Sequence, residues 1–523
     1  MKKSIYILIG GLLTLGFVSC EPEFDNPVDE GGFYTTGDAD MSNFVAVGNS
    51  LTAGFADNAL YITGQENSFP NILAQQFALA GGGDFTQPLM ADNLGGLLLN
   101  GTQVAQNRLV LEADPMTGEP LTPIILEGNP TTEVTTSPTG PFNNMGVPGA
   151  KSFHLVTPGY STLNPYFGRF ATSASTTVIA DAVSLNPSFF TLWIGNNDIL
   201  SFATSGGIGV DQIGNLDPST YGPNDITDPN VFAAAYSQQV DALKAGASGG
   251  VLINIPDVTS IPFFTTVPFA PLSPLDPNFG PQIPELNAQF GLLNQAFAFL
   301  GVPERSIIFS TTGASAVVVH DESLPNLAAE LTQVLIGGGL DKATATIFGL
   351  QYGQARQATS DDLLVLTSSS VIGTVNNDRL AELIGFGVPE AQAAQLAING
   401  ITFPLTDQFV LLPSEQAAVA TATAAYNATI SSLAAANGLG YVDARRYLRD
   451  VATSGVAYDS GLLTSVFATG GAFSLDGVHP TPRGYAYTAN LIIDEINKTY
   501  NATIPKVNIG NYGTITVANN VNN

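Results

Sequence analysis

The chain of 523 residues is 45% hydrophobic, which is enough for a large core, and its length fits one large domain or two to three smaller ones. Only 11% of the residues are charged, whereas Gly and Pro number 54 and 33; this composition favours a loop-rich compact protein over a disordered or coiled-coil chain. The formal net charge of −28 argues against nucleic-acid binding, because a surface of that sign repels phosphates.

Residues 1–19 have the pattern of a secretory signal peptide. Lys2 and Lys3 precede an apolar run over residues 5–18, which is shorter than the roughly 20 apolar residues that a membrane-spanning helix needs. Cys20 follows directly and is the only cysteine in the chain, so it can form no internal disulfide. The segment that ends at Cys20 resembles a bacterial lipoprotein signal, which implies that Cys20 becomes the lipidated first residue. A short anchor that is retained in the membrane is the alternative.

Residues 20–40 are expected to form a flexible tether, since they are acidic at their start and contain Pro and Gly. Acidic residues directly after the lipidated cysteine resemble the surface-export signals of some Bacteroidetes lipoproteins. We therefore expect a lipoprotein of the cell envelope, held in the outer membrane by its lipid and facing either the periplasm or the exterior. The membrane is thus an expected partner, and nucleic acid is not.

From residue 41 onward, short apolar runs alternate with helical patterns. Runs with strand composition predict four strands, at residues 44–47, 188–195, 249–256 and 441–443. Helical patterns precede the last two strands. The second of these patterns, over residues 414–438, has an acidic first turn and closes with Asn-Gly, which are start and stop signals for a helix. Continuous apolar strands between helices predict a parallel sheet covered on both faces, in a doubly wound α/β sandwich.

Two long stretches do not fit a minimal sandwich. Residues 80–144 are rich in Gly, Pro, Thr and Asn and are expected to form extended loops. Residues 257–413 lie between the third strand and the next core helix, and a structureless loop of that length is implausible. We expect an inserted subdomain or lid that caps the site. It would separate core parts at residues 41–256 and 414–505, with residues 506–523 as a tail.

A serine follows the first expected strand at once, in the sequence GNSLTAG. By itself, Ser50 is an ordinary turn or helix-cap residue. A serine hydroxyl becomes a nucleophile when a base takes its proton, and His479 can supply that base. Asp476, three residues before the histidine, can accept a hydrogen bond from the other imidazole nitrogen. Ser50, His479 and Asp476 are therefore the predicted nucleophile, base and orienting acid.

Acyl transfer also requires hydrogen-bond donors for the oxyanion. The candidates are the backbone N–H of Ser50, the side-chain amide of Asn197 and the backbone N–H of Gly149. Gly146 is a second candidate for the glycine donor, although the residues that follow favour Gly149. Each motif is weak alone, but their order along the chain and their places near expected strand ends make a chance combination far rarer than any single match.

Together these four blocks resemble those of the SGNH/GDSL hydrolase family. Residues 48–51 read Gly-Asn-Ser-Leu, with asparagine where the family usually has aspartate. The second block is matched by Gly149, the third by residues 195–198 and the fifth by residues 476–479. The blocks frame most of the chain, and residues 257–413 lie outside the shared core.

The resemblance implies a flavodoxin-like three-layer α/β/α sandwich and serine esterase or lipase chemistry, with no metal or other cofactor. It implies that Ser50 is the nucleophile, His479 the base and Asp476 its partner in a catalytic triad. Ser50, Gly149 and Asn197 would form the oxyanion hole.

The expected function is hydrolysis of carboxylic esters, with lipid-like esters or acetylated carbohydrates as substrates. The Phe-rich start of the insertion, at Phe263, Phe264 and Phe269, slightly favours acyl chains. Two alternatives stay open: a non-catalytic ligand-binding lipoprotein, and an acyltransferase whose acceptor is a carbohydrate hydroxyl.

The chain has two further histidines, both expected to be structural. His154 follows the glycine block and lies near the expected pocket, whereas His320 is expected at a strand end in the insertion. Neither has metal-ligand partners at a recognisable spacing. Residues 209–230 are rich in Asp and Asn but lack an EF-hand pattern, so we expect a solvated loop and no calcium site.

Overall fold

The computed structural model describes residues 33–113, 120–459 and 461–518. The expected signal segment, Cys20 and most of the expected tether lie outside these residues, so their roles stay predictions. None of the described helices combines the length and the hydropathy of a membrane-spanning segment.

A five-stranded parallel sheet forms the centre of the molecule. Its strands, in chain order, are β1 (Phe44–Gly48), β6 (Asn144–Gly146), β7 (Phe189–Trp193), β8 (Gly249–Ile253) and β13 (Gly440–Val442). Their order across the sheet is β6-β1-β7-β8-β13, which corresponds to 2-1-3-4-5 in chain order. In doubly wound sheets of this order, the strand order reverses next to the first strand. A crevice for ligands therefore opens at the carboxyl ends of β1 and β7.

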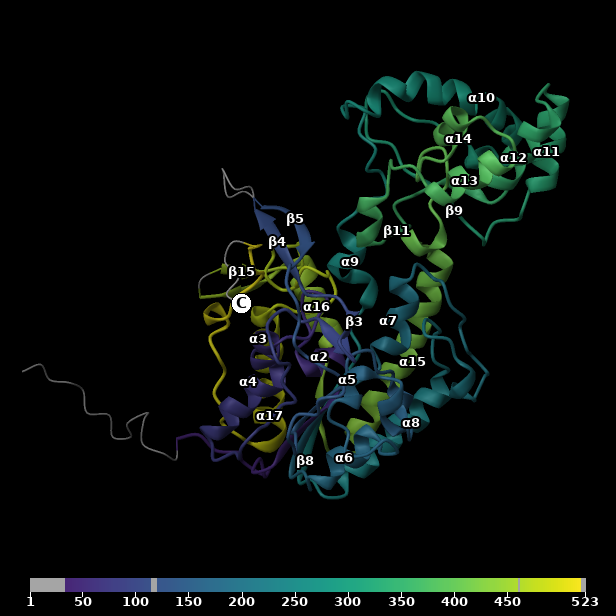
Figure 1. The fold of residues 1–523 in the computed structure, drawn as a ribbon. Helices are drawn as coiled ribbons and strands as arrows, with labels where there is room; N and C mark the ends of the chain where they lie inside the picture. The colour runs from purple at the N-terminus through teal and green to yellow at the C-terminus, as the bar shows by residue number, and fades with distance from the viewer. Residues whose placement is uncertain (1–32, 114–119, 460, 519–523) are drawn as a thin grey trace, which may run out of the picture.

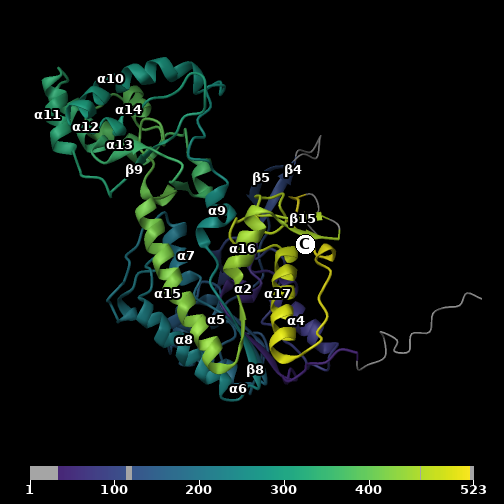
Figure 2. The same ribbon diagram turned by 180° about the vertical axis from the view of Figure 1, so that it is seen from behind.

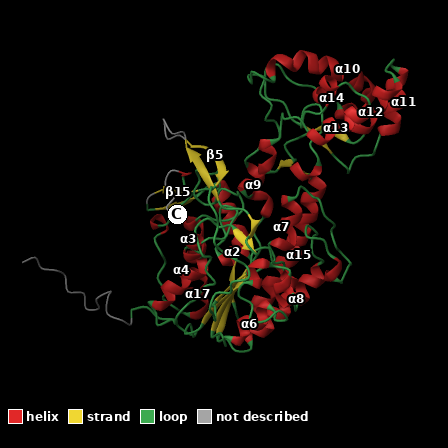
Figure 3. Cartoon of the chain, viewed as in Figure 1, coloured by secondary structure: helices red, strands yellow, loops and turns green. Residues whose placement is uncertain are grey.

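Both faces of the sheet are buried. In β1, Val45 and Val47 pack on one side and Phe44 and Ala46 on the other, because alternate side chains of a strand point to opposite faces. The first face is covered by α6 (Val178–Ser184), α7 (Asn197–Thr204), α8 (Pro229–Lys244) and α15 (Pro413–Asn437). The second face is covered by α4 (Phe69–Ala78) and α17 (Pro482–Tyr500). The sheet is thus the middle of three layers, as Figures 1 and 3 show.

The four strands expected from the sequence are present, with ends shifted by up to three residues. The helix expected before the last strand is α15, and Gly438 ends it in a left-handed conformation with φ 62°, as its closing signal predicted. Strand β6 was not expected, because three residues between a loop and a turn carry too little pattern to be recognised.

Residues 80–144, expected to be extended loops, contain two β-hairpins. Strand β2 (Leu97–Leu99) pairs with β3 (Thr102–Ala105), and β4 (Leu109–Ala113) pairs with β5 (Pro120–Ile125). The expectation of extended loops missed these two hairpins, and loops form most of the rest of the segment. Leu97 and Val110 are fully buried and anchor one strand of each hairpin, whereas the abundant Gly and Pro residues lie mostly in the turns and connections.

Residues 257–413 contain a hydrophobic cluster of their own, in which Phe290, Val318 and Tyr352 are buried. Its helices are α9 (Pro262–Thr265), α10 (Ile283–Phe299), α11 (Ala328–Gly337), α12 (Lys342–Tyr352), α13 (Asn377–Gly385) and α14 (Glu390–Leu396). Two short ribbons pair β9 (Val318–His320) with β10 (Ala355–Gln357), and β11 (Leu363–Leu364) with β12 (Val410–Leu411). Figures 1 and 2 show helices α10 to α14 projecting from the sandwich, beyond α9 and the start of α15.

Short elements complete the sandwich around the carboxyl ends of the strands. They are α2 (Ser50–Ala53), α3 (Ile62–Glu66), α5 (Pro165–Gly168), α16 (Ala444–Thr453) and the hairpin of β14 (Val456–Tyr458) with β15 (Gly461–Leu463). Helix α16 is amphipathic. Val451 is buried and packs in the core, with the half-buried Leu448 against it, whereas Arg445, Arg446 and Arg449 are exposed.

Replacing Gly48 by alanine is expected to destabilise the sheet. A Cβ at this position would lie 2.4 Å from the Trp193 carbonyl oxygen and 2.2 Å from the Thr52 Oγ1. We expect a loss of about 1–3 kcal/mol in the free energy of unfolding, the usual cost of overpacking. Urea unfolding followed by the fluorescence of Trp193, the only tryptophan, measures it.

Gly291→Ala in α10 is the matched control, because a Cβ there meets no atom within 4 Å. This change should leave the Trp193 transition where it is or stabilise the helix by roughly 0.5–1 kcal/mol. Equal destabilisation by both changes would contradict the close approach at Gly48.

Candidate active site

Ser50 lies at the carboxyl end of β1, where it begins α2 and is 7% exposed. The side-chain Oδ1 of Asn49 accepts a hydrogen bond from the Leu51 N–H at 3.0 Å and so caps this short helix. The Nδ2 of Asn49 also lies 3.4 Å from the Oδ1 of Asn196, which follows β7. Asn49 therefore supports the turn that presents the serine.

His479 lies between Ser50 and Asp476. Its Nε2 is 2.9 Å from the Ser50 Oγ, and its Nδ1 is 2.9 Å from the Asp476 Oδ2. The imidazole also packs against Phe55, with the two ring centroids 4.7 Å apart. Folding thus joins a serine and a histidine that are 429 residues apart in the sequence, and the three polar side chains form one continuous series of contacts.

The Asp476 carboxylate accepts several hydrogen bonds. Its Oδ1 accepts from the backbone N–H groups of Val478 and His479, each at 2.8 Å, and from the Ser474 hydroxyl at 3.1 Å. Its Oδ2 accepts from the Asn58 N–H at 2.9 Å. Burial alone would raise the pKa of Asp476, but attraction to His479 and the hydrogen bonds outweigh it and lower this pKa to about 2.

The ionised carboxylate decides the roles of the two imidazole nitrogens. A carboxylate without a proton can only accept, so the Nδ1 of His479 donates to Asp476. In the neutral imidazole the Nε2 is then left as an acceptor, and the Ser50 hydroxyl donates to it. This is the proton arrangement that a base next to a nucleophile requires.

The loop after α2 helps to position the Asp476 carboxylate. The sequence patterns did not single out this loop. Asp57 and Asn58 have φ angles of 51° and 61°, which Asp and Asn adopt more readily than most residues. The Asp57 carboxylate accepts from the Leu475 N–H at 3.0 Å and from the Tyr61 hydroxyl at 2.8 Å. The sequence signal was only the Asp-Asn pair itself, which is typical of a turn.

The two candidate glycines differ in the hydrogen bonding of their N–H groups. The Gly146 N–H donates to the Asn144 Oδ1 at 3.0 Å, whereas the Gly149 N–H has no acceptor within the described residues. Gly149 is the third residue of a turn in which the Ala150 N–H donates to the Val147 oxygen at 3.1 Å. Its φ of 79° at that position favours glycine.

Asn197 connects this glycine turn to the loop after β7. Its Nδ2 donates to the Ala150 oxygen at 2.9 Å through one hydrogen, which leaves the second amide hydrogen for another acceptor. The next residue, Asp198, is buried, and its carboxylate accepts from the Ser152 N–H at 2.8 Å and from the Ser152 hydroxyl at 2.7 Å. Burial raises the pKa of Asp198, and these hydrogen bonds oppose that rise.

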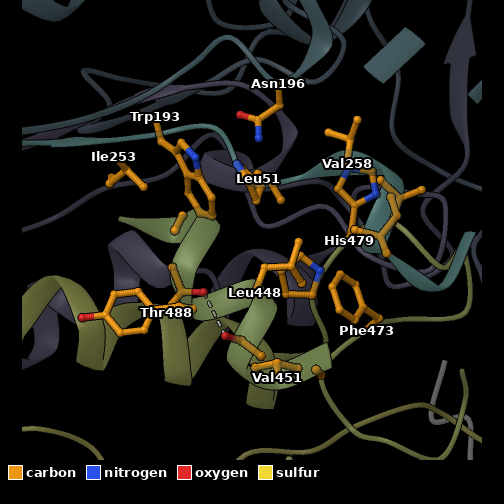
Figure 4. A pocket seen from close by; sticks show the side chains of 18 of the residues that line it. Leu51, Trp193, Asn196, Ile253, Val258, Leu448, Val451, Phe473, His479 and Thr488 are labelled. Atoms are coloured by element: carbon orange, nitrogen blue, oxygen red, sulfur yellow. Dashed lines mark hydrogen bonds between the residues drawn. The ribbon is translucent and has the colours of Figure 1, made fainter. Parts of the chain in front are cut away.

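A cavity of about 120 Å³ opens beside Ser50 and His479. Asn196 and Asn197 also line it, so the loops after β1 and β7 and the loop before α17 meet there. Most of its remaining wall is apolar and includes Trp193, Ile253, Val258, Leu448, Val451 and Phe473, all labelled in Figure 4. Gly149 is not among the lining residues.

His154 packs against its neighbours in a structural role, as expected, and does not line the cavity. Its Nδ1 accepts from the Lys151 N–H at 3.0 Å, and its ring stacks on Tyr160 with centroids 4.3 Å apart. Burial and then the charge of Lys151 lower the pKa of His154 to about 4.

His320 has neighbours that its sequence context did not reveal. One possible ligand atom from each of His320, Glu322 and Asp407 lies within 4.8 Å of the others. Asp407 is distant in the sequence and comes close only through folding of the insertion, so no spacing pattern could predict the group. An imidazole and two carboxylates are ligand types that divalent cations accept. The three residues do not line the cavity and take no part in the contacts of Ser50.

The insertion reaches the site near its start. Val258 and Ile261 line the cavity, and the Phe263 N–H donates to the Gly477 oxygen at 3.0 Å. Helices α10 to α14 contribute none of the described lining residues, and Figure 2 shows them away from α16 and α17. Whether the insertion acts as a lid stays a prediction.

Comparison of the chain with family models, with curated proteins and with solved structures found no match.

The buried Asp57 is expected to make stability fall as the pH rises. Burial raises the pKa of Asp57 to about 6 from its ordinary value of 3.8, so the folded state holds this proton more tightly than the unfolded state does. Stability from this group is therefore present below the unfolded pKa and is lost as the pH rises through about 6. The predicted loss is about 3 kcal/mol.

Asp57→Asn removes this titration while keeping the shape. The difference in free energy of unfolding between the variant and the wild type should therefore move in favour of the variant between pH 4 and pH 7. Urea unfolding at several pH values measures it. A difference that stays constant over this range would contradict the raised pKa.

Proposed function

We propose that the protein is a serine ester hydrolase of the SGNH/GDSL type. The observation that carries the proposal is the series of contacts from the Ser50 Oγ through His479 to the ionised Asp476. The 2-1-3-4-5 strand order adds support, because it is the flavodoxin-like order and puts Ser50 beside the crevice where such sheets bind ligands.

In the first half-reaction, the Ser50 Oγ attacks the carbonyl carbon of the ester while its proton passes to the His479 Nε2. The carbonyl oxygen takes the negative charge of the tetrahedral intermediate. The intermediate then collapses, the bond to the alcohol oxygen breaks, and His479 gives its proton to the leaving alcohol. Asp476 keeps the imidazole in position and stabilises the imidazolium by its charge.

In the second half-reaction, water attacks the acyl-enzyme. His479 takes a proton from the water and returns it to the Ser50 Oγ as the carboxylic acid leaves. The N–H groups of Ser50 and Gly149 and the free amide hydrogen of Asn197 would hold the oxyanion in both steps. The Asn197–Ala150 hydrogen bond joins the loop that carries Gly149 to the loop that carries Asn197, so these two donors move together.

The proposed location is the cell envelope, through a lipid on Cys20. Replacing Cys20 by serine should leave unprocessed precursor or release soluble protein, because the lipid is attached to the thiol. Fractionation of cells that express either form tests this. A mature, lipid-modified Cys20→Ser protein would contradict the proposal.

Changes at the four proposed site residues should reduce ester hydrolysis in different ways. Ser50→Ala removes the attacking atom and should abolish both turnover and labelling by a serine-directed phosphonate. Asp476→Asn keeps the shape but favours the wrong imidazole tautomer, so we expect a loss on the order of 10⁴ in kcat. His479→Ala should cost at least as much, since these residues act as one unit.

Asn197→Ala should keep phosphonate labelling but lower kcat by roughly 10²–10³, the usual effect of losing one oxyanion donor. Arg449→Ala, at an exposed position of α16, is the matched control and should leave turnover unchanged. Wild-type hydrolysis by Ser50→Ala would overturn the proposed function, and would leave Ser50 as a turn residue only.

A further inference from the structure

We propose that the cavity beside Ser50 binds the acyl chain of the substrate, so that the preferred substrate is an ester of a medium-length aliphatic acid rather than an acetyl ester. The inference rests on the proposed function, since it assigns a substrate class to the same site. Ser50 and His479 belong to the lining of this cavity, which continues from them into the space between the sheet and the helices α16 and α17.

Three parts of the fold supply apolar walls. The carboxyl ends of β7, β8 and β13 contribute Trp193, Ile253 and Val442, while α16 and α17 contribute Leu448, Val451 and Leu491. Figure 4 shows side chains from the sheet and from α16 around the same space as His479. A chain attached to the Ser50 oxygen would therefore meet hydrocarbon from more than one side.

Two polar side-chain atoms in these walls already have partners in the protein. The Trp193 Nε1 donates to the Asn254 oxygen at 3.1 Å, and the Thr488 hydroxyl donates to the Gly484 oxygen at 3.0 Å. Within the described residues, no Lys, Arg, Asp or Glu lines the cavity. Away from Ser50, the remaining side-chain hydroxyls in the lining are those of Tyr447 in α16 and Tyr487 in α17, both of which are half-buried.

This chemistry discriminates between the two substrate classes that the sequence left open. A sugar ring in the cavity would lose water from its hydroxyls and gain few hydrogen bonds in return, which is unfavourable. A hydrocarbon chain loses no hydrogen bonds there and gains the full benefit of apolar burial. The cavity wall therefore favours an aliphatic acyl group over an acetylated carbohydrate placed in it.

Helix α16 gives the cavity its outer wall. Leu448 and Val451 face the cavity, whereas Arg446 and Arg449 are exposed to solvent. This division follows the helical period, in which residues three and four apart share a face. The position of α16 is thus explained by its apolar stripe, and the same stripe supplies the acyl-binding surface.

The length of the substrate's acyl chain should affect kcat/KM strongly until the cavity is full. Each methylene buried adds about fourfold to kcat/KM, the equivalent of about 0.8 kcal/mol. Between acetyl and hexanoyl esters of one alcohol we therefore expect a rise on the order of 10²-fold. The test uses the purified mature protein with acetyl, butyryl, hexanoyl and octanoyl aryl esters.

Leu448→Trp tests the assigned wall, because the larger ring would occupy part of the cavity. We expect the ratio of kcat/KM for octanoyl over acetyl ester to fall at least tenfold. Arg449→Trp makes the same change one residue along, on the exposed side of the helix, and should leave the ratio unaltered. Thermal unfolding checks that both variants fold. If Leu448→Trp does not fold, Val451→Ala replaces it and should raise the octanoyl-to-hexanoyl ratio.

A binding measurement separates this inference from the proposed function. Calorimetry on Ser50→Ala should show methyl octanoate binding at least tenfold more tightly than methyl acetate, without turnover. Tight octanoate-ester binding by a wild-type protein that neither hydrolyses esters nor reacts with the phosphonate would overturn the proposed function and keep the acyl site. Active enzyme with no preference for longer chains, or equal loss on every ester in Leu448→Trp, would overturn the acyl site and keep the function.

Discussion

The hydrogen bonds that converge on the Asp476 carboxylate set the geometry of the whole site. Backbone donors of its own turn hold one oxygen, while Asn58 and His479 share the other. A buried carboxylate is tolerated only when hydrogen bonds and opposite charge offset the loss of water. Because its donors come from both the loop after α2 and the loop before α17, an arrangement that satisfies the carboxylate also places the imidazole next to Ser50.

The strand order brings the other groups to that pair. In the 2-1-3-4-5 sheet, β1 lies between β6 and β7, so the loops after these three strands meet at one edge. They carry Ser50, Gly149 and Asn197, and the Asn197–Ala150 hydrogen bond joins two of them. The same edge leaves space towards α16, and the apolar side chains there explain why a hydrocarbon-lined cavity lies beside a polar site.

The parts of the fold that the sequence predicted are those with local patterns. The apolar run of β1 and the start and stop signals of α15 repeat over enough residues to be recognised, and the Asp-x-x-His turn is short enough to be read directly. Strand β6, the hairpins of residues 80–144 and the group at His320 depend on contacts between distant segments, which leave no local pattern. Asp57 was missed for the same reason, since its role comes from the Leu475 N–H that it meets only after folding.

The hydrogen bond from the Phe263 N–H to the Gly477 oxygen has a mechanical consequence. Gly477 lies in the turn between Asp476 and His479 and has a φ of 72°. A Cβ added there would lie only 3.0 Å from the Phe263 nitrogen, so the turn has little freedom to move. Phe263 belongs to α9, through which the chain enters the projecting insertion. A force that displaces the insertion would therefore act through this hydrogen bond on the turn at Gly477. It would change the distance between the Asp476 carboxylate and the His479 imidazole.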